Sequence, residues 1–137
     1  MSLVLDSSVT LAWVYSDETT DAVVEVFDLL RQGAAWVPQL WRLEVANALQ
    51  MGVRRKCHDE EFRDATLADL SRLPIHIDNE TDEQAWGATL DLASLHNLTL
   101  YDAAYLELAV RRKLALATLD AELRKAAHLQ RVKLLGK

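Results

Sequence analysis

Short apolar runs alternate along the chain with amphipathic stretches, which is the pattern of βαβ units around a parallel sheet. The apolar runs predict five short strands, at residues 3–5, 35–37, 75–77, 114–118 and 132–135. Pro38 stops the second strand, and Pro74 precedes the third. Strands separated in this way by helical segments predict a parallel sheet with crossover helices.

Apolar residues at helical spacing predict helices between these strands. A short helix follows Asp6, a break at 16–18 precedes a helix that runs to Gly33, and further helices begin near positions 40, 58, 81, 103 and 120. The helix at 40–55 has its predicted apolar positions at Leu43, Ala46, Leu49 and Val53. Thr81 and Gln84 have the spacing of a capping box for a helix that contains Trp86.

The composition is that of a soluble globular protein. The chain has 137 residues, of which 50% are apolar and 26% charged, so we expect a single domain over 1–137. No run approaches the roughly 18 apolar residues needed to cross a bilayer, and no leader precedes the first strand. The lone Cys57 excludes an internal disulfide and suits a reducing compartment. We therefore expect a cytoplasmic protein without a membrane segment.

Four acids occupy positions that a parallel α/β chain directs to one edge of its sheet. Asp6 ends the first apolar run, Asp120 follows the fourth, and Glu44 and Asp102 lie in the first turns of two helices. Because the loops after parallel strands gather at the carboxyl edge, these side chains can converge there. Any one of them alone is more often a helix cap or a surface residue. Their joint placement is what predicts a site.

Clustered acids repel one another unless divalent cations neutralise them. Oxygen ligands select hard ions such as Mg²⁺ or Mn²⁺, and the four histidines are not at zinc spacing. One ion with a carboxylate that orients water, or two ions about 3.5–4 Å apart, would equally support phosphodiester cleavage. The net charge of −6 does not exclude an RNA substrate, because bound cations reverse the local sign.

Small polar and aromatic residues lie beside the four acids. Ser7 follows the first acid, Asn47 lies one helical turn after the glutamate, and Thr118 lies two residues before the last acid. The two hydroxyl groups can bind a phosphate or orient a carboxylate, and the amide can hydrogen-bond near the glutamate. Tyr101 and Tyr105 flank the third acid and can stack on a base or pack in the core.

Two basic runs, 54–56 and 111–113, are open to two interpretations. They can contact RNA phosphates, or they can place favourable positive charge at helix C-termini. The four tryptophans are predicted to be core or interface residues rather than platforms for substrate. Among apolar residues, Trp13, Trp41 and the helix of Phe62 are candidates for a protein interface.

Three segments closely resemble the motif blocks of the PIN domain, and within it the VapC-type toxins of toxin–antitoxin systems. They are VLDSSVTLAW, LEVANAL and LTLYDAAYLELAVRRKLALATLDAELRKAA, and they extend from the first strand to the last helix. The resemblance implies a three-layer α/β/α fold with a central parallel sheet and a Mg²⁺- or Mn²⁺-dependent endoribonuclease activity. It places the catalytic and metal-binding acids at Asp6, Glu44, Asp102 and Asp120, with supporting residues at Ser7, Asn47 and Thr118.

The resemblance also implies partners: an RNA substrate, a second copy of the chain in a homodimer, and a small VapB-like antitoxin. Three alternatives differ in class. A phosphatase with a nucleophilic Asp would need a second Asp where Ser8 stands. A phospho-acceptor receiver domain would leave Glu44 unexplained. A PIN-fold binding module without turnover would not need four intact acids.

Overall fold

The computed structural model describes all residues 1–137 and contains one five-stranded sheet with the strand order β3-β2-β1-β4-β5. The strands are β1 (Ser2–Leu5), β2 (Ala34–Val37), β3 (Ile75–Ile77), β4 (Ala115–Ala117) and β5 (Leu134–Leu135). All neighbouring strands are parallel, and in the central strand Leu3 aligns with both Ala35 and Ala115. The predicted parallel sheet is therefore confirmed.

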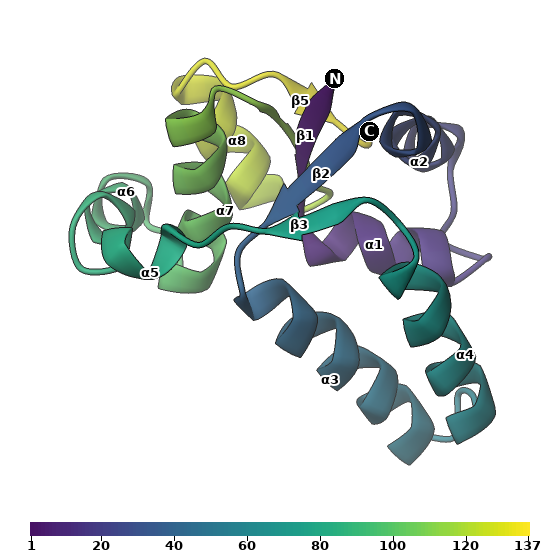
Figure 1. Ribbon diagram of the computed structural model, residues 1–137. Coiled ribbons are helices and arrows are strands. Elements are labelled where there is room, and N and C mark those ends of the chain that lie inside the picture. The colour runs from purple at the N-terminus through teal and green to yellow at the C-terminus, as the bar shows by residue number, and fades with distance from the viewer.

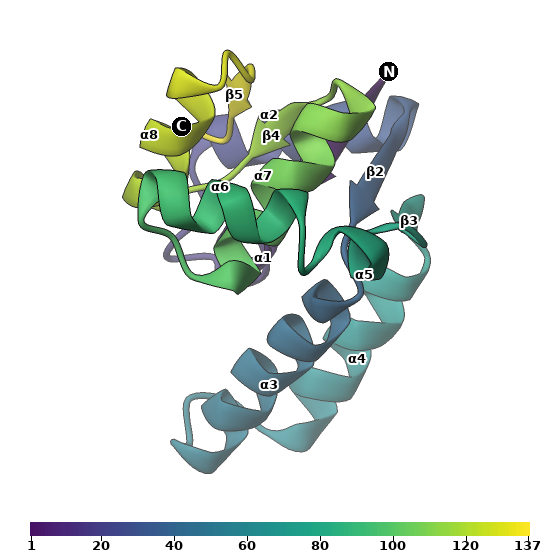
Figure 2. The ribbon, with the colours of Figure 1, turned by 90° about the vertical axis from the view of Figure 1, so that its left-hand side faces the viewer.

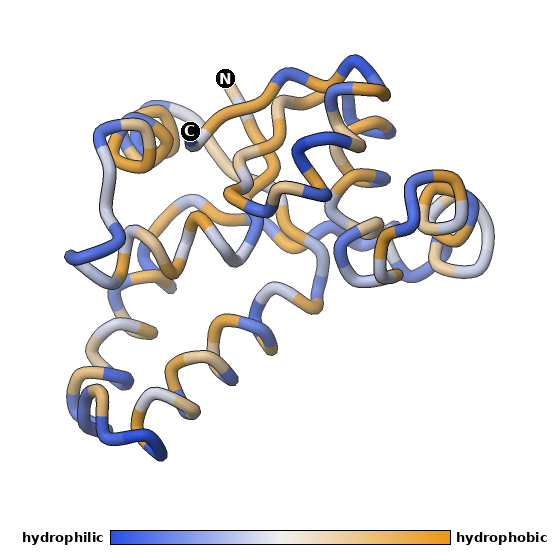
Figure 3. The backbone as a smooth tube through the Cα atoms, turned by 180° about the vertical axis from the view of Figure 1, so that it is seen from behind, coloured by the Kyte–Doolittle hydropathy of each residue, from blue (hydrophilic) through white to orange (hydrophobic).

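Helices cover both faces of this sheet and complete the predicted α/β/α layers (Figures 1 and 2). They are α1 (Ser7–Val14), α2 (Asp21–Gln32), α3 (Leu40–Arg54), α4 (Glu60–Ser71), α5 (Thr81–Gln84), α6 (Ala88–His96), α7 (Leu100–Arg112) and α8 (Ala121–Leu129). Helices α3 and α4 form a hairpin that extends away from the sheet, and its far turn is hydrophilic (Figure 3). No helix is both long enough and apolar enough to span a membrane.

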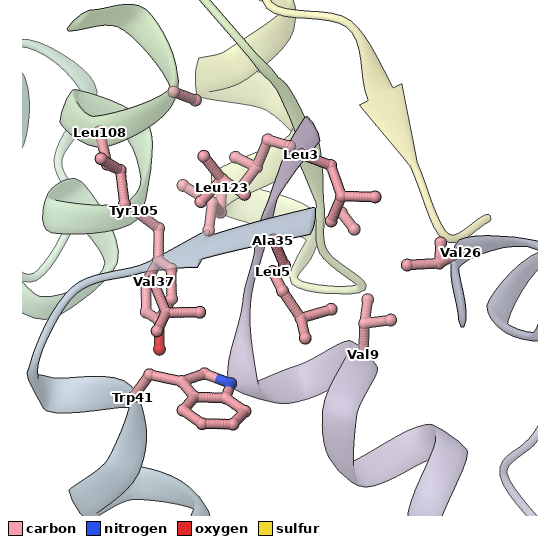
Figure 4. Close-up of a cluster of buried hydrophobic side chains, with 14 of the residues drawn as sticks. Leu3, Leu5, Val9, Val26, Ala35, Val37, Trp41, Tyr105, Leu108 and Leu123 are labelled. Atoms are coloured by element: carbon pink, nitrogen blue, oxygen red, sulfur yellow. The ribbon is translucent and has the colours of Figure 1, made fainter. Parts of the chain in front are cut away.

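The core lies on both sides of β1, whose residues Leu3, Val4 and Leu5 are almost completely buried. Figure 4 shows Val9 and Val26 from α1 and α2 on one side of the strands, with α7 and α8 on the other. An all-apolar strand is expected here, because a central parallel strand is covered on both faces. The neighbour pairing of β1 with β4 also brings the ends of these two strands together, which positions the site described below.

The predicted apolar face of α3 is confirmed at Leu49, which is buried, and half-buried at Ala46 and Val53, but it is wrong at Leu43. Leu43 is 75% exposed, and the buried residues of this helix are Trp41, Val45, Leu49 and Gly52. The Trp41 indole N–H donates to the Thr10 hydroxyl at 3.0 Å, which fixes the start of α3 against α1. This burial also removes Trp41 as a candidate for a protein interface.

The predicted capping box is also wrong. The Thr81 hydroxyl donates to Asp78 at 2.6 Å instead of capping a long helix, and Glu80 occupies the N-cap position. The chain leaves the helical conformation at Gly87, so α5 and α6 are separate helices. Trp86 lies at this interruption and is 92% exposed, so it is not a core residue.

The second basic run takes part in a network of ion pairs. Arg111 contacts Asp78, Glu107 and Glu80 at 2.6, 2.7 and 2.9 Å, and Arg112 contacts Asp78 at 2.8 Å. Burial raises the pKa of Asp78, but hydrogen bonds from these arginines and from Thr81 outweigh it and hold the pKa well below its ordinary value. Both guanidinium groups are thus engaged within the fold rather than free for RNA phosphates.

Candidate active site

Asp6 lies directly after β1, and its side chain is fixed by two hydroxyl groups. Only 4% of the residue is exposed. Its Oδ2 accepts hydrogen bonds from Ser8 Oγ at 2.6 Å and from Thr118 Oγ1 at 2.8 Å. The carboxylate makes no capping bond to the N-terminus of α1. Asp6 is therefore held at the carboxyl edge of the sheet by side-chain hydrogen bonds rather than by capping α1.

Thr118 connects the ends of β1 and β4. Besides donating to Asp6, its hydroxyl accepts a hydrogen bond from the backbone N–H of Asp120 at 3.1 Å. Ser8 supports the same connection, because its hydroxyl accepts from the Leu119 N–H at 3.0 Å. The Asp120 carboxylate accepts from the Leu123 N–H at 2.8 Å and so caps α8, and its charge also raises the pKa of Asp102.

Glu44 is oriented by Tyr105, whose hydroxyl donates to Glu44 Oε1 at 2.6 Å. Tyr105 is fully buried, and Figure 4 shows its hydroxyl pointing from α7 toward the start of α3. Burial and the nearby charges of Asp6 and Glu44 raise the pKa of Tyr105 far above its ordinary value. The phenol therefore remains a proton donor to Glu44, and it cannot stack on a substrate base.

Three of the four predicted acids have raised pKa values. Burial is the main cause of the raised pKa of Asp6, which the hydrogen bonds from Ser8 and Thr118 oppose. Burial also raises the pKa of Glu44, and the charges of Asp6 and Asp102 add to it. The pKa of Asp102 is raised by burial and by the charges of Asp120 and Asp6. The charges of Asp6, Asp102 and Asp120 thus each act on another of these acids, which places the four carboxylates in one electrostatic environment.

The donor set has the chemistry of a hard divalent cation site, because it consists of carboxylate oxygens with uncompensated negative charge. Asp6 is anchored by its hydroxyl partners, while Glu44 and Asp102 are only partly buried. No three His, Cys, Asp or Glu side chains meet at metal-binding distances. The fit to Mg²⁺ or Mn²⁺ therefore rests on donor type and charge.

Of the predicted supporting residues, Ser7 and Thr118 interact with the acids, and Asn47 does not. Ser7 begins α1, and its side chain opposes the rise in the pKa of Glu44. Asn47 is exposed and makes no hydrogen bond to Glu44, so that predicted contact is absent. Sequence reasoning missed the role of Ser8. The available signal was its spacing, since Ser8 stands two residues after Asp6 and its hydroxyl can reach that carboxylate.

The fold and the site together define a class: parallel α/β/α domains with a cluster of acids at the carboxyl edge of the sheet. Within this class the sequence profile of the PIN domain matches residues 3–129. The chain belongs to the PIN-domain family.

Among curated relatives, Ribonuclease VapC1 of Mycobacterium tuberculosis (strain ATCC 25618 / H37Rv) is 33% identical over 101 residues, which is 74% of each chain. Among solved structures, PAE2754 from Pyrobaculum aerophilum has a TM-score of 0.65 at 22% identity, with 92% of this chain and 84% of that chain covered. FitAcB from Neisseria gonorrhoeae has a TM-score of 0.68 at 15% identity, with coverages of 98% and 96%. These structural similarities establish the fold.

Proposed function

We propose that this protein is a metal-dependent endoribonuclease and the toxin of a type II toxin–antitoxin pair. The proposal rests on the inferred convergence of Asp6, Glu44, Asp102 and Asp120 at one sheet edge. Their mutual effects on pKa support this convergence. The 33% identity to a protein named Ribonuclease VapC1 supports RNA as the substrate.

The four acids would hold Mg²⁺ or Mn²⁺, which when bound supplies an activated water and stabilises the charge that develops at the phosphate. The other residues position these acids. Ser8 and Thr118 fix the orientation of Asp6, and Tyr105 fixes that of Glu44. Such fixed orientation lowers the reorganisation needed when the phosphodiester approaches.

Purified protein with Mg²⁺ or Mn²⁺ is expected to cleave RNA, and Asp102→Asn is expected to lower the rate by at least about 100-fold. The matched control is Asp91→Asn, since Asp91 also lies in the first turn of a helix but is exposed and outside the site. Cleavage is measured on labelled RNA with and without EDTA. Cleavage that persists in EDTA, or in the Asp102→Asn variant, would contradict the proposed mechanism.

We further propose that the protein acts in the cytoplasm as a homodimer and is inhibited by a small VapB-like antitoxin. Solved relatives include a toxin–antitoxin complex from Klebsiella pneumoniae and VapBC2 from Rickettsia felis, with TM-scores of 0.62 and 0.67. Induced expression is expected to arrest growth, and coexpression of a small protein encoded beside it should restore growth. The Asp102→Asn variant is the control. Normal growth with folded wild-type protein present would argue against the toxin role.

A further inference from the structure

A small cavity lies between the start of α3, helices α5 and α6, and the start of α7. Its volume is about 210 Å³. In Figure 2 the start of α3 lies next to α5, and α7 lies behind α6. Pockets for drug-sized ligands occupy about 300–1,000 Å³, so this cavity suits a single ring system.

The cavity shares two helices with the acidic site, although none of the four acids lines it. Leu40 lines it one helical turn before Glu44 on α3, and Tyr101 and Ala104 line it on either side of Asp102 on α7. Leu40 and Glu44 are four apart and therefore lie on the same side of α3, whereas Tyr101 and Ala104 share a side of α7 and are direct chain neighbours of the segment that carries Asp102. An occupant of the cavity is therefore adjacent to the edge at which a phosphodiester must meet the carboxylates.

The lining combines an apolar wall with an exposed aromatic ring. Leu40, Ala85 and Leu100 form apolar surface, and Tyr101 lines the cavity while 65% exposed. Exposed aromatic rings are the usual platforms on which unpaired bases stack. Tyr105 cannot act as a stacking platform for a base, because it is fully buried and donates a hydrogen bond to Glu44. Tyr101 is thus the aromatic side chain beside Asp102 that can contact a base.

Polar groups in the lining complement the edge of a base. Gln39 offers an amide donor and acceptor, and Asp82 offers a carboxylate acceptor; neither makes a side-chain hydrogen bond within the protein. Thr89 also lines the cavity, and its Oγ1 is the buried side-chain polar atom that lacks a hydrogen-bond partner. An unpaired buried hydroxyl is unfavourable, so a polar group that enters the cavity would supply a missing partner.

One wall of the cavity is held in place by the arginine network. Thr81, at the start of α5, donates to Asp78, and Arg111 binds both Asp78 and Glu80. These contacts tie the beginning of α5 to the C-terminal end of α7. The cavity is therefore formed before a ligand arrives, which lowers the conformational cost of binding.

We propose that this cavity binds one unpaired RNA base next to the scissile phosphate, with Tyr101 stacking on the base and Gln39 and Asp82 selecting bases that carry an exocyclic amino group. This inference rests on the proposed ribonuclease function and deepens it. An apolar side chain of a protein partner is the competing occupant. The position beside the helical turns that carry Glu44 and Asp102, and the acceptor at Asp82, favour a base.

Binding is tested without catalysis by NMR titration of the wild-type protein with adenosine, cytidine, guanosine and uridine in EDTA. Shifts are expected at Leu100, Tyr101 and Ala104, and they should be smallest with uridine, which has no amino group. Tyr101→Phe should retain these shifts, and Tyr101→Ala should lose them. Trp86→Ala is the matched control, because Trp86 is an exposed aromatic residue nearby that does not line the cavity.

Cleavage supplies the second measurement, with short RNAs that vary one nucleotide beside the cleaved bond. Tyr101→Ala is expected to raise KM about tenfold and to flatten the preference for that nucleotide, with a smaller effect on kcat. Tyr101→Phe and Trp86→Ala should remain within about twofold of the wild type.

The outcomes separate the inference from the proposed function. Nucleoside binding at Tyr101 without any RNA cleavage would support the base site and refute the ribonuclease. Cleavage with unchanged KM and preference in Tyr101→Ala, and no nucleoside shifts, would overturn the base site alone. Equal shifts with uridine would overturn the selection by Asp82. Loss of antitoxin inhibition alone in Tyr101→Ala would assign the cavity to a protein partner and overturn the inference.

Discussion

Replacement of Asp6 by Asn is expected to abolish RNA cleavage and at the same time to make the metal-free protein more stable. Only 4% of Asp6 is exposed to solvent, and burial is the main cause of its raised pKa. Its ionised form is disfavoured by this buried environment. Asn has nearly the same shape, can still accept a hydrogen bond from Ser8 or Thr118, and carries no charge.

Proton linkage gives the direction in which the stability gain from Asp6→Asn changes with pH. The pKa of Asp6 is higher in the folded protein than its ordinary value of 3.8. At any pH between 3.8 and the folded pKa, the folded state therefore binds more protons than the unfolded state. The stability contributed by protonated Asp6 is fully present below pH 3.8 and is lost as the pH rises through the pKa of Asp6 in the folded protein. The gain from Asp6→Asn should therefore be present at pH 7 and disappear below about pH 3.8.

Thermal unfolding in EDTA and in Mg²⁺ measures both parts of this prediction. A cation that binds only the folded state raises the wild-type unfolding temperature by mass action, and Asp6→Asn should not respond. Asp91→Asn is again the control, since it changes charge equally outside the site. A variant that is less stable than wild type in EDTA, or that still gains stability from Mg²⁺, would contradict the assigned role of Asp6.

Part of this site follows from sequence because it depends on local rules. The apolar run 3–5 and its following acid are enough to place Asp6 at the carboxyl edge, since a central parallel strand must be apolar on both faces. The hydroxyl groups that fix Asp6 are harder to foresee. Thr118 is 112 positions away, and its contact exists because β4 is the neighbour of β1.

Tyr101 and Tyr105 show why packing decides roles that sequence leaves open. The two residues are four apart on α7 and both lie beside Asp102, so periodicity treats them alike. Tyr105 is one turn further into the helix, where the core covers it, while Tyr101 lies at the exposed start of the helix. The same limitation explains Leu43, because apolar spacing alone does not show which face of a projecting helix meets the core.

Replacement of Arg111 by Ala is expected to lower the free energy of unfolding by about 3–5 kcal/mol, the range for removal of one partner from a buried ion pair. The side chain of Asp78 is 0% exposed and that of Glu107 is 4% exposed. Asp78 would keep Arg112, but Glu107 has no other charged partner. The lost guanidinium also makes several hydrogen bonds at once, which a Lys cannot reproduce.

Urea unfolding at pH 7 measures this cost, with Arg72→Ala as the matched control. Arg72 also pairs with an aspartate, but both side chains are more than half exposed, so its loss should change stability by less than about 0.5 kcal/mol. Adding Glu107→Gln to Arg111→Ala should recover part of the loss by removing the unpaired charge. Because the pKa of Asp78 is lowered in the fold, its contribution is present above its ordinary value of 3.8 and fades in acid. Equal losses in Arg111→Ala and Arg72→Ala, or no recovery by Glu107→Gln, would show that this network does not stabilise the fold.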